Sequence, residues 1–209
     1  MRRLTDNTSA RWAVVVPVKG TDGAKSRLGG DPGLRAELAR AIALDTVEAA
    51  LAAATVARVI VVTTAGAAEP FARLGAQIVV DESGAGLNAA IRLGLAAAAD
   101  GASCNVAVLL GDVPALQPHE LDDALALALR HPTTIVPDAD GIGSVLTTAL
   151  AGYPHTPAFG GGSRAAHGER GYIELAVSAD SGLRRDVDTL DQLRQLGAAR
   201  VGPRTAALL

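Results

Sequence analysis

The stretch WAVVVPV, residues 12–18, decides the fold because it predicts the first strand of a parallel sheet. Its side chains are continuously apolar and mostly β-branched, which is typical of a strand covered on both faces. The polar, glycine-rich segment KGTDGAKSRLGG, residues 19–30, follows and predicts a loop. Asp31 and Pro32 then predict a helix start, as its N-cap and its first helical residue. Apolar residues four positions apart predict the buried side of that helix: Leu34, Leu38 and Ile42.

The same alternation of strand and helix continues through the first two thirds of the chain. Strands are expected at 12–18, 56–63, 77–80, 106–110 and 133–136, and helices at about 31–54, 67–74, 87–99 and 118–130. Such an alternation favours a mostly parallel sheet with right-handed crossovers and helices on both faces. We therefore expect an α/β fold, a single-domain, Rossmann-like three-layer sandwich over residues 1–209 with tails at about 1–11 and 197–209.

The alternation changes after residue 137. Two prolines and four glycines fall within residues 151–162, so an irregular segment is expected there. Around it we expect a strand at 145–150, a helix at 163–168, strands at 171–177 and 183–188, and a last helix at 189–196.

Composition and charge exclude several classes of function. The net charge is −3 and no basic stripe is interleaved with aromatic residues, so nucleic acid is not an expected partner. No apolar run approaches a membrane span and Met1–Arg11 lacks the apolar stretch of a signal peptide, so we expect a cytoplasmic protein with no membrane partner. The single Cys104 excludes an internal disulfide and is expected to be buried or half-buried. The four histidines lack the spacing of zinc ligands.

Ligands of open parallel sheets bind beyond the carboxyl ends of the strands, so the residues there are candidates for function. The loop after the first strand holds Lys19, Lys25 and Arg27, and its two lysines are the only ones among 19 basic residues. Cations and backbone N–H groups in such a loop can wrap a triphosphate, although neither a Walker A motif nor a GxGxxG motif is present. The alternative is an ordinary basic surface loop. Gly86 and Asn88 follow the third strand.

Acidic residues form a second set of candidates. Asp112 follows the fourth strand, and Asp186 and Asp188 flank Val187. In an extended segment, residues i and i+2 point to the same face about 7 Å apart, and two such carboxylates favour a cation between them. With Asp112 they predict a Mg²⁺ site for one or two ions. The alternatives are that Asp112 only forms a turn and that Asp188 only caps the following helix.

A glycine-rich segment precedes the helix expected at 163–168. Gly160 and Ser163 belong to the run Phe159–Ser163, and glycines before a helix can cradle an anion with free N–H groups. The alternative is a flexible loop with Ser163 as the N-cap. Ser144 can supply a further hydroxyl, and His167 is the only histidine near these candidates.

The order of these motifs resembles that of a known family, the phospholactate/phosphoenolpyruvate guanylyltransferases of coenzyme F420 biosynthesis. The resemblance covers about residues 12–196 and departs from the family at Gly111, Val113 and Ser144, where Ala, Leu and Thr are usual. The matching motifs are P-V-K at 17–19, A-K-S-R-L at 24–28, G-L-N-A-A-I at 86–91, L-G-D-V-P at 110–114, Gly-Ser at 143–144, F-G-x-G-S-x-x-x-H at 159–167 and D-V-D at 186–188. The wider superfamily includes the molybdenum-cofactor guanylyltransferases, but Pro-Val-Lys in place of their Gly-Gly loop counts against that branch.

The resemblance implies a fold similar to nucleotide-diphospho-sugar transferases and a role for each candidate residue. Lys19, Lys25, Arg27, Gly86 and Asn88 would bind GTP, with Lys19, Lys25 and Asp112 catalytic. Asp112, Asp186 and Asp188 would hold Mg²⁺, and Ser144, Gly160 and Ser163 would bind phosphoenolpyruvate. The implied reaction transfers GMP from GTP to that acid and releases pyrophosphate.

Three alternatives stay open at this stage. The acceptor can be 2-phospho-L-lactate, or a different compound such as molybdopterin or a sugar phosphate. The protein can also bind a nucleotide without catalysis. The sequence decides neither the preference for guanine nor whether the chain forms a homodimer.

Overall fold

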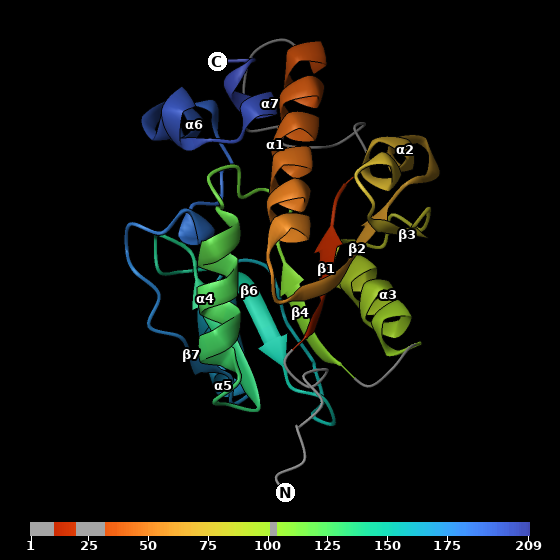
Figure 1. Ribbon diagram of the computed structural model, residues 1–209, viewed down its shortest axis with the longest axis vertical. Coiled ribbons are helices and arrows are strands. Elements are labelled where there is room, and N and C mark those ends of the chain that lie inside the picture. The colour runs from red at the N-terminus through yellow and green to blue at the C-terminus, as the bar shows by residue number, and fades with distance from the viewer. Residues whose placement is uncertain (1–10, 20–31, 101–103) are drawn as a thin grey trace, which may run out of the picture.

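A computed structural model describes residues 11–19, 32–100 and 104–209, which build one seven-stranded sheet with the order β3-β2-β1-β4-β6-β5-β7 (Figure 1). The strands are β1 (Trp12–Pro17), β2 (Val56–Thr63), β3 (Gln77–Val80), β4 (Asn105–Leu109), β5 (Thr133–Pro137), β6 (Ser144–Ala149) and β7 (Ile173–Glu174). The expected N-terminal tail, the Asp31 cap and most of the basic loop lie outside the described residues.

The described helices follow the predicted alternation. They are α1 (Pro32–Ala52), α2 (Ala65–Arg73), α3 (Leu87–Ala99), α4 (Pro118–Ala128), α5 (Ser163–Glu169), α6 (Leu190–Leu196) and α7 (Pro203–Ala206), with 3₁₀ turns η4 (Gly182–Arg184) and η5 (Ala198–Arg200). None of the described helices is both long and apolar enough to cross a membrane.

The expected mostly parallel sheet is confirmed, with one strand reversed. β1 pairs in parallel with β2 and β4, and β2 pairs in parallel with β3. β6 runs antiparallel to both of its neighbours, β4 and β5. The start of β6 therefore lies at the same edge of the sheet as the end of β4.

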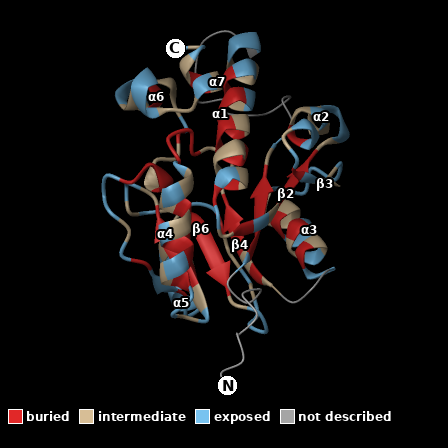
Figure 2. Cartoon of the chain, viewed as in Figure 1, coloured by how far each residue is buried: buried red, intermediate tan, exposed pale blue. Residues whose placement is uncertain are grey.

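β1 shows why its sequence is continuously apolar. Its alternate residues Trp12, Val14 and Val16 belong to one hydrophobic cluster, which includes α1 and α4 residues. Ala13 and Val15 belong to the cluster on the opposite face, which includes α3 residues. Both faces are thus covered, as the three-layer prediction requires, and Figure 2 shows the central strands as buried.

Two secondary-structure predictions in the last third of the chain are wrong. The strand expected at 183–188 is absent, because residues 182–184 form η4 and the residues after it are irregular. The strand expected at 171–177 is reduced to β7, the outermost strand of the sheet.

The predicted buried side of α1 is correct at two of its three residues. Leu34, expected on the buried side of α1, is 46% exposed, whereas Leu38 and Ile42 pack on Leu193 of α6.

The C-terminal residues also differ from the expected tail, because they form η5 and α7 and dock on α1. The Asp45 carboxylate on α1 accepts hydrogen bonds from the Arg204 and Thr205 backbone N–H groups, at 3.2 and 2.8 Å. The Arg204 guanidinium bridges Asp45 and Glu48. Asp45 and Thr205 are both buried, so these residues belong to the folded body.

Candidate active site

The topology brings several candidate residues to one edge of the sheet. Lys19, which is exposed, follows the end of β1, and Asp112 follows the end of β4. Ser144 begins the reversed strand β6, so it lies at that edge as well. A Cβ on Gly111 would lie 3.1 Å from the Pro17 carbonyl oxygen, which shows how closely the ends of β1 and β4 approach. Lys25 and Arg27 lie outside the described residues.

The acidic residues gather beside the end of β4. The Val187 N–H donates to the Asp112 carbonyl oxygen at 2.9 Å, which ties the segment 186–188 to Asp112. Burial and then the negative charges of Asp112, Asp138 and Asp188 raise the pKa of Asp186 to about 7. A divalent cation would relieve this repulsion, so the residues present fit such an ion electrostatically.

The geometry of these carboxylates differs from the expected pair on one strand. Segment 185–189 is not a strand, and Asp186 is half-buried while Asp188 is exposed. Among the residues that the structure describes, no three His, Cys, Asp or Glu side chains are arranged to hold a metal ion. Thr189, and not Asp188, caps α6 through a capping box with Gln192. The roles of the three aspartates as metal ligands therefore stay predictions.

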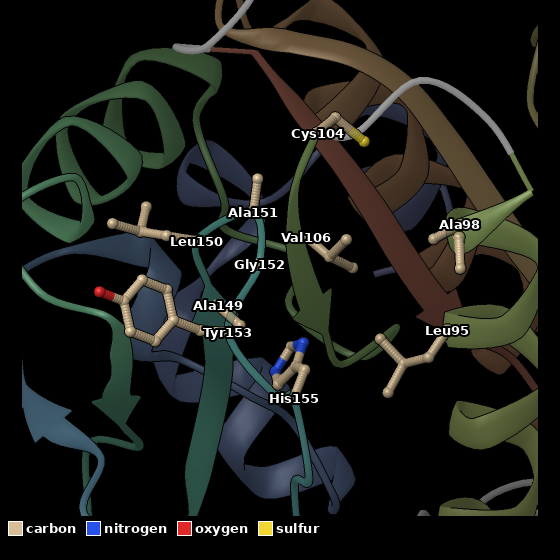
Figure 3. A pocket seen from close by; sticks show the side chains of 11 residues that line it. Leu95, Ala98, Cys104, Val106, Ala149, Leu150, Ala151, Gly152, Tyr153 and His155 are labelled. Carbon is tan, nitrogen blue, oxygen red and sulfur yellow. The ribbon is translucent and has the colours of Figure 1, made fainter.

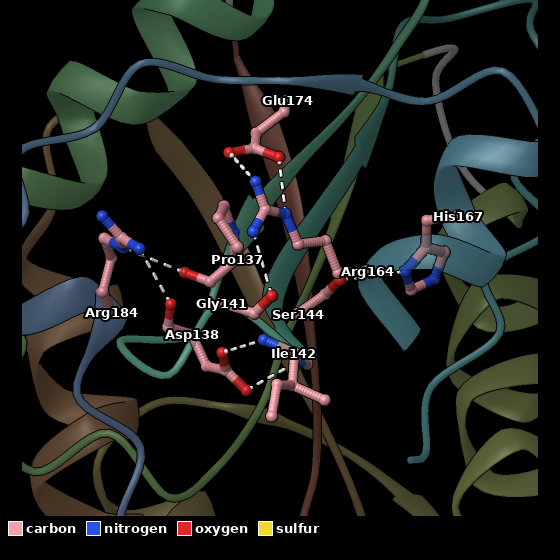
Figure 4. A network of polar contacts seen from close by, with 10 residues as sticks. Pro137, Asp138, Gly141, Ile142, Ser144, Arg164, His167, Glu174 and Arg184 are labelled. Atoms are coloured by element: carbon pink, nitrogen blue, oxygen red, sulfur yellow. Dashed lines mark hydrogen bonds and ion pairs between the residues drawn. The ribbon is translucent and has the colours of Figure 1, made fainter. Parts of the chain in front are cut away.

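Asp138 is a residue of this site that the sequence analysis missed. It follows β5, and its carboxylate accepts hydrogen bonds from the Ile142 and Gly143 N–H groups, at 2.9 and 2.6 Å (Figure 4). These bonds hold the turn that leads into Ser144. The signal in the sequence is an aspartate five residues before a glycine at the start of a strand, which is typical of many turns and points to no particular function.

Asn88 joins two of the predicted motifs. Its amide nitrogen donates to the Phe159 carbonyl oxygen at 2.8 Å, and its amide oxygen accepts from the Phe159 N–H at 3.0 Å. The side chain predicted to bind the nucleotide thus fixes the start of the glycine-rich segment 159–163. Gly86, with φ +95°, caps α3 in a backbone conformation that favours glycine.

The glycine-rich segment leads into α5 with Gly162 as the N-cap, at φ +71°. Ser163 is the first helical residue, so the alternative that made it the N-cap is wrong. Ser163 is buried, and its Oγ lies 3.8 Å from the position of a Cβ on Gly143. Gly160 is exposed, with φ +141°. The hydroxyls of Ser144 and Ser163 therefore belong to one neighbourhood.

His167 lies next to the Ser144 hydroxyl and is fully buried. Its Nδ1 lies 3.1 Å from Ser144 Oγ, and its Nε2 accepts a hydrogen bond from the Ala158 N–H at 2.8 Å. Its ring packs between Phe159 and Tyr172, each with a centroid distance of 5.2 Å. Two of the few aromatic residues of this chain thus support one histidine. Burial and then the charge of Arg170 lower the pKa of His167 to about 4.

Arg164 and Glu174 lie beside the turn that leads into Ser144. The Arg164 guanidinium makes two hydrogen bonds to the Glu174 carboxylate, at 2.8 and 3.0 Å, and a third to the Gly141 carbonyl oxygen at 2.9 Å (Figure 4). α5 is thereby clamped to β7 and to the turn before β6.

A cavity of about 370 Å³ lies at the opposite edge of the sheet (Figure 3). Cys104, half-buried as expected, precedes β4 there, and Ala149 ends β6. The other lining residues are mainly apolar, and the cavity holds none of the predicted site residues.

Comparisons with known proteins identify the family of the chain. The model of the MobA-like NTP transferase domain matches residues 23–196. A phosphoenolpyruvate guanylyltransferase from Streptomyces coelicolor is 50% identical over 202 residues, covering 95% of each chain.

Solved structures share the fold at low sequence identity. A putative nucleotide-diphospho-sugar transferase from Desulfovibrio desulfuricans has a TM-score of 0.64 at 16% identity, covering 88% of this chain and 94% of its own. Rv0371c from Mycobacterium tuberculosis, in complex with manganese, has a TM-score of 0.58 at 22% identity, covering 90% and 98%. The chain therefore belongs to the MobA-like NTP transferase family and, within it, to the phosphoenolpyruvate guanylyltransferases.

Proposed function

We propose that this protein transfers GMP from GTP to phosphoenolpyruvate and releases pyrophosphate. Its relative from Streptomyces coelicolor, which bears the name of that activity, is 50% identical along 95% of the chain. The observation that carries the proposal at the site is the attachment of segment 186–188 to Asp112, with a further carboxylate on Asp138. This acidic group lies at the sheet edge that Lys19 and Ser144 share.

In the proposed reaction, a phosphate oxygen of phosphoenolpyruvate attacks the α-phosphorus of GTP in line with the leaving pyrophosphate. A P–O bond to the acceptor forms as the bond between the α-phosphorus and the bridging oxygen breaks. The acceptor phosphate is ionised at neutral pH, so no general base is required. Catalysis consists of positioning and of neutralising the phosphate charges.

Each part of the site has a role in this scheme. Lys19, together with Lys25 and Arg27 of the same loop, would neutralise the triphosphate. Ser144 and Ser163 would hold the acid. Six further assignments complete the set: Gly86 and Asn88 for the nucleotide, Gly160 for the acid, and Asp112, Asp186 and Asp188 for Mg²⁺. When bound, Mg²⁺ would screen the charge between the phosphates. A fold relative, Rv0371c, has been seen with manganese, which supports a divalent ion.

The test is an assay of pyrophosphate release from GTP, Mg²⁺ and phosphoenolpyruvate, with the diphosphate-linked product identified by mass spectrometry. Asp112→Asn is expected to abolish turnover, and the matched control Asp180→Asn, which changes a carboxylate 94% exposed, is expected to retain it. Absence of pyrophosphate with phosphoenolpyruvate contradicts the proposal. GTP binding that survives Asp112→Asn, without turnover by the wild type, favours a non-catalytic nucleotide-binding protein.

Competition in the same assay decides the acceptor. 2-Phospho-L-lactate, a sugar phosphate and molybdopterin are each added against phosphoenolpyruvate, and ATP is added against GTP. The proposal requires phosphoenolpyruvate and GTP to be the preferred pair. Membership in coenzyme F420 biosynthesis, a cytoplasmic location and a homodimer stay predictions that this assay does not address.

A further inference from the structure

The hydrogen-bond partners of His167 determine which of its ring nitrogens carries the proton. The Ala158 backbone N–H points at Nε2 from 2.8 Å. A backbone N–H can only donate, so Nε2 must be the bare, accepting nitrogen. A neutral imidazole carries one proton, which therefore lies on Nδ1. Full burial, which also lowers the pKa of His167 to about 4, keeps the ring neutral at physiological pH.

The tautomer in turn decides what the Ser144 hydroxyl can do. The protonated Nδ1 faces Ser144 Oγ at 3.1 Å, and the Ser163 carbonyl oxygen is a second acceptor for the ring, so the serine oxygen can only accept from this N–H group (Figure 4). The hydroxyl proton of Ser144 must then point away from the histidine. The serine therefore keeps its O–H proton free for another partner, while one of its two acceptor lone pairs is occupied by the N–H group of the histidine.

The backbone at Ser144 is held independently of the histidine. The Asp138 carboxylate accepts the Ile142 and Gly143 N–H groups, which fixes the turn directly before the serine. Ser144 is 3% exposed and lies on a strand hydrogen-bonded on both sides. Asp138 thus determines where the hydroxyl oxygen lies, and His167 determines where its proton points.

We propose that His167 is a positioning residue that turns the Ser144 hydroxyl into a dedicated hydrogen-bond donor for an oxygen of the anionic acceptor substrate. The proposal rests on the proposed function, in which Ser144 contacts the phosphorylated acid. Ionised phosphate and carboxylate oxygens accept hydrogen bonds and donate none, so a hydroxyl whose proton is free matches them.

A purely structural role for His167 predicts a different pattern. Its Nε2 contact with Ala158 and its packing against Phe159 support the glycine-rich segment whatever the serine does. Two conservative variants separate the roles. His167→Asn places an amide nitrogen near the Nδ1 position and keeps a donor for Ser144. His167→Gln reaches the Nε2 position and keeps an acceptor for Ala158.

We expect His167→Gln to raise KM for phosphoenolpyruvate roughly ten- to a hundredfold, the effect of losing one hydrogen bond to a charged group. KM for GTP is expected to stay unchanged. His167→Asn is expected to raise KM for phosphoenolpyruvate clearly less than His167→Gln does, because it keeps the donor to Ser144. The reverse ranking, with His167→Asn impaired and His167→Gln intact, overturns the proposal and indicates a structural role.

A second variant background measures the coupling to the serine. In Ser144→Ala, which lacks the hydroxyl, His167→Gln is expected to cause no further rise in KM for phosphoenolpyruvate. A further rise of full size in that background overturns the proposal. Ser144→Thr keeps a hydroxyl, and in that background His167→Gln is expected to raise KM for phosphoenolpyruvate again.

The tautomer itself is measured in the wild-type protein, so the test does not depend on a folded variant. NMR of ¹⁵N-histidine-labelled protein is expected to show a protonated Nδ1 and a bare Nε2 for His167. The opposite tautomer overturns the proposal.

Failure of the proposed function gives a different result. It appears as no pyrophosphate release by the wild type. Calorimetric binding of phosphoenolpyruvate then takes the place of KM, and equal affinities of the wild type and His167→Gln overturn the positioning role.

Discussion

Acid is expected to destabilise this protein through His167, and the size of the effect follows from its burial. The side chain is fully buried, and burial followed by the charge of Arg170 lowers its pKa to about 4 in the folded state. In the unfolded chain the pKa of histidine is about 6.5. Between these two values the unfolded state binds a proton that the folded state does not, so stability is lost as pH falls.

The magnitude comes from the pH interval below the unfolded pKa. From pH 7 to pH 5 the unfolded histidine gains its proton over about 1.5 pH units, which corresponds to about 2 kcal/mol at roughly 1.4 kcal/mol per unit. His155 acts in the same direction, because burial and then the charge of His167 lower its pKa to about 3. Asp186 acts in the opposite direction, because burial and then the neighbouring carboxylates raise its pKa to about 7 in the folded state, so the contribution of His167 has to be measured by difference.

Urea unfolding followed by circular dichroism at pH 7 and pH 5 measures the effect. The difference between the two unfolding free energies is expected to be about 2 kcal/mol smaller in His167→Gln than in the wild type. Because this is a difference within each protein, a general loss of stability in the variant cancels. His119→Gln, which removes an exposed imidazole at the start of α4, controls for the substitution itself. A wild-type pH dependence in His167→Gln would refute the reasoning.

Three further predictions test the packing and the ion dependence. Asp45→Ala is expected to lower the free energy of unfolding by about 3 to 5 kcal/mol, because this carboxylate is 2% exposed and holds α7 through three hydrogen bonds. The control Asp191→Ala removes an exposed ion pair and should lower it by less than about 1 kcal/mol in the same urea titration. Equal losses in the two variants would contradict the anchoring role of Asp45. Gly94→Ala is expected to destabilise by about 1 to 3 kcal/mol, since the added Cβ would lie 2.8 Å from a valine methyl on β2 and closer still to one on β1. The control Gly66→Ala, with no atom within 4 Å of its Cβ, should be neutral or stabilising in thermal unfolding; the same loss in both variants would show that close packing is not the cause. Removal of divalent ions with EDTA is expected to abolish pyrophosphate release and Mg²⁺ to restore it, whereas undiminished turnover in EDTA would exclude the proposed metal site.

Local patterns were sufficient to predict most of the fold. The apolar run that begins at Trp12 and the later apolar runs predicted the bounds of β1 to β4 within a residue or two. Strands covered on both faces have continuously apolar sequences, which makes them easy to locate. The bounds of β2, β3 and α3 agree with those predicted. The predicted sequence of strand and helix also implied the parallel sheet, since right-handed crossovers leave few alternatives.

Predictions failed where long-range contacts decide the conformation. Residues 183–188 were predicted to form a strand, yet they are irregular after η4 and the Val187 N–H is bound to the Asp112 carbonyl oxygen. The C-terminal residues lack a strong periodic pattern, but Asp45, far away in the sequence, accepts their backbone N–H groups. Neither partner can be identified from neighbouring residues.

The sequence by itself determined the fold class, the family and the identities of the candidate site residues, because each of these is encoded in local composition and in the order of motifs. Only the tertiary structure decided how those residues act on one another. It showed that Asn88 binds the Phe159 backbone, that Asp138 joins the acidic group, and that His167 faces Ser144. Each of these relations joins groups that are distant in the chain, and only the path of the folded backbone brings them together.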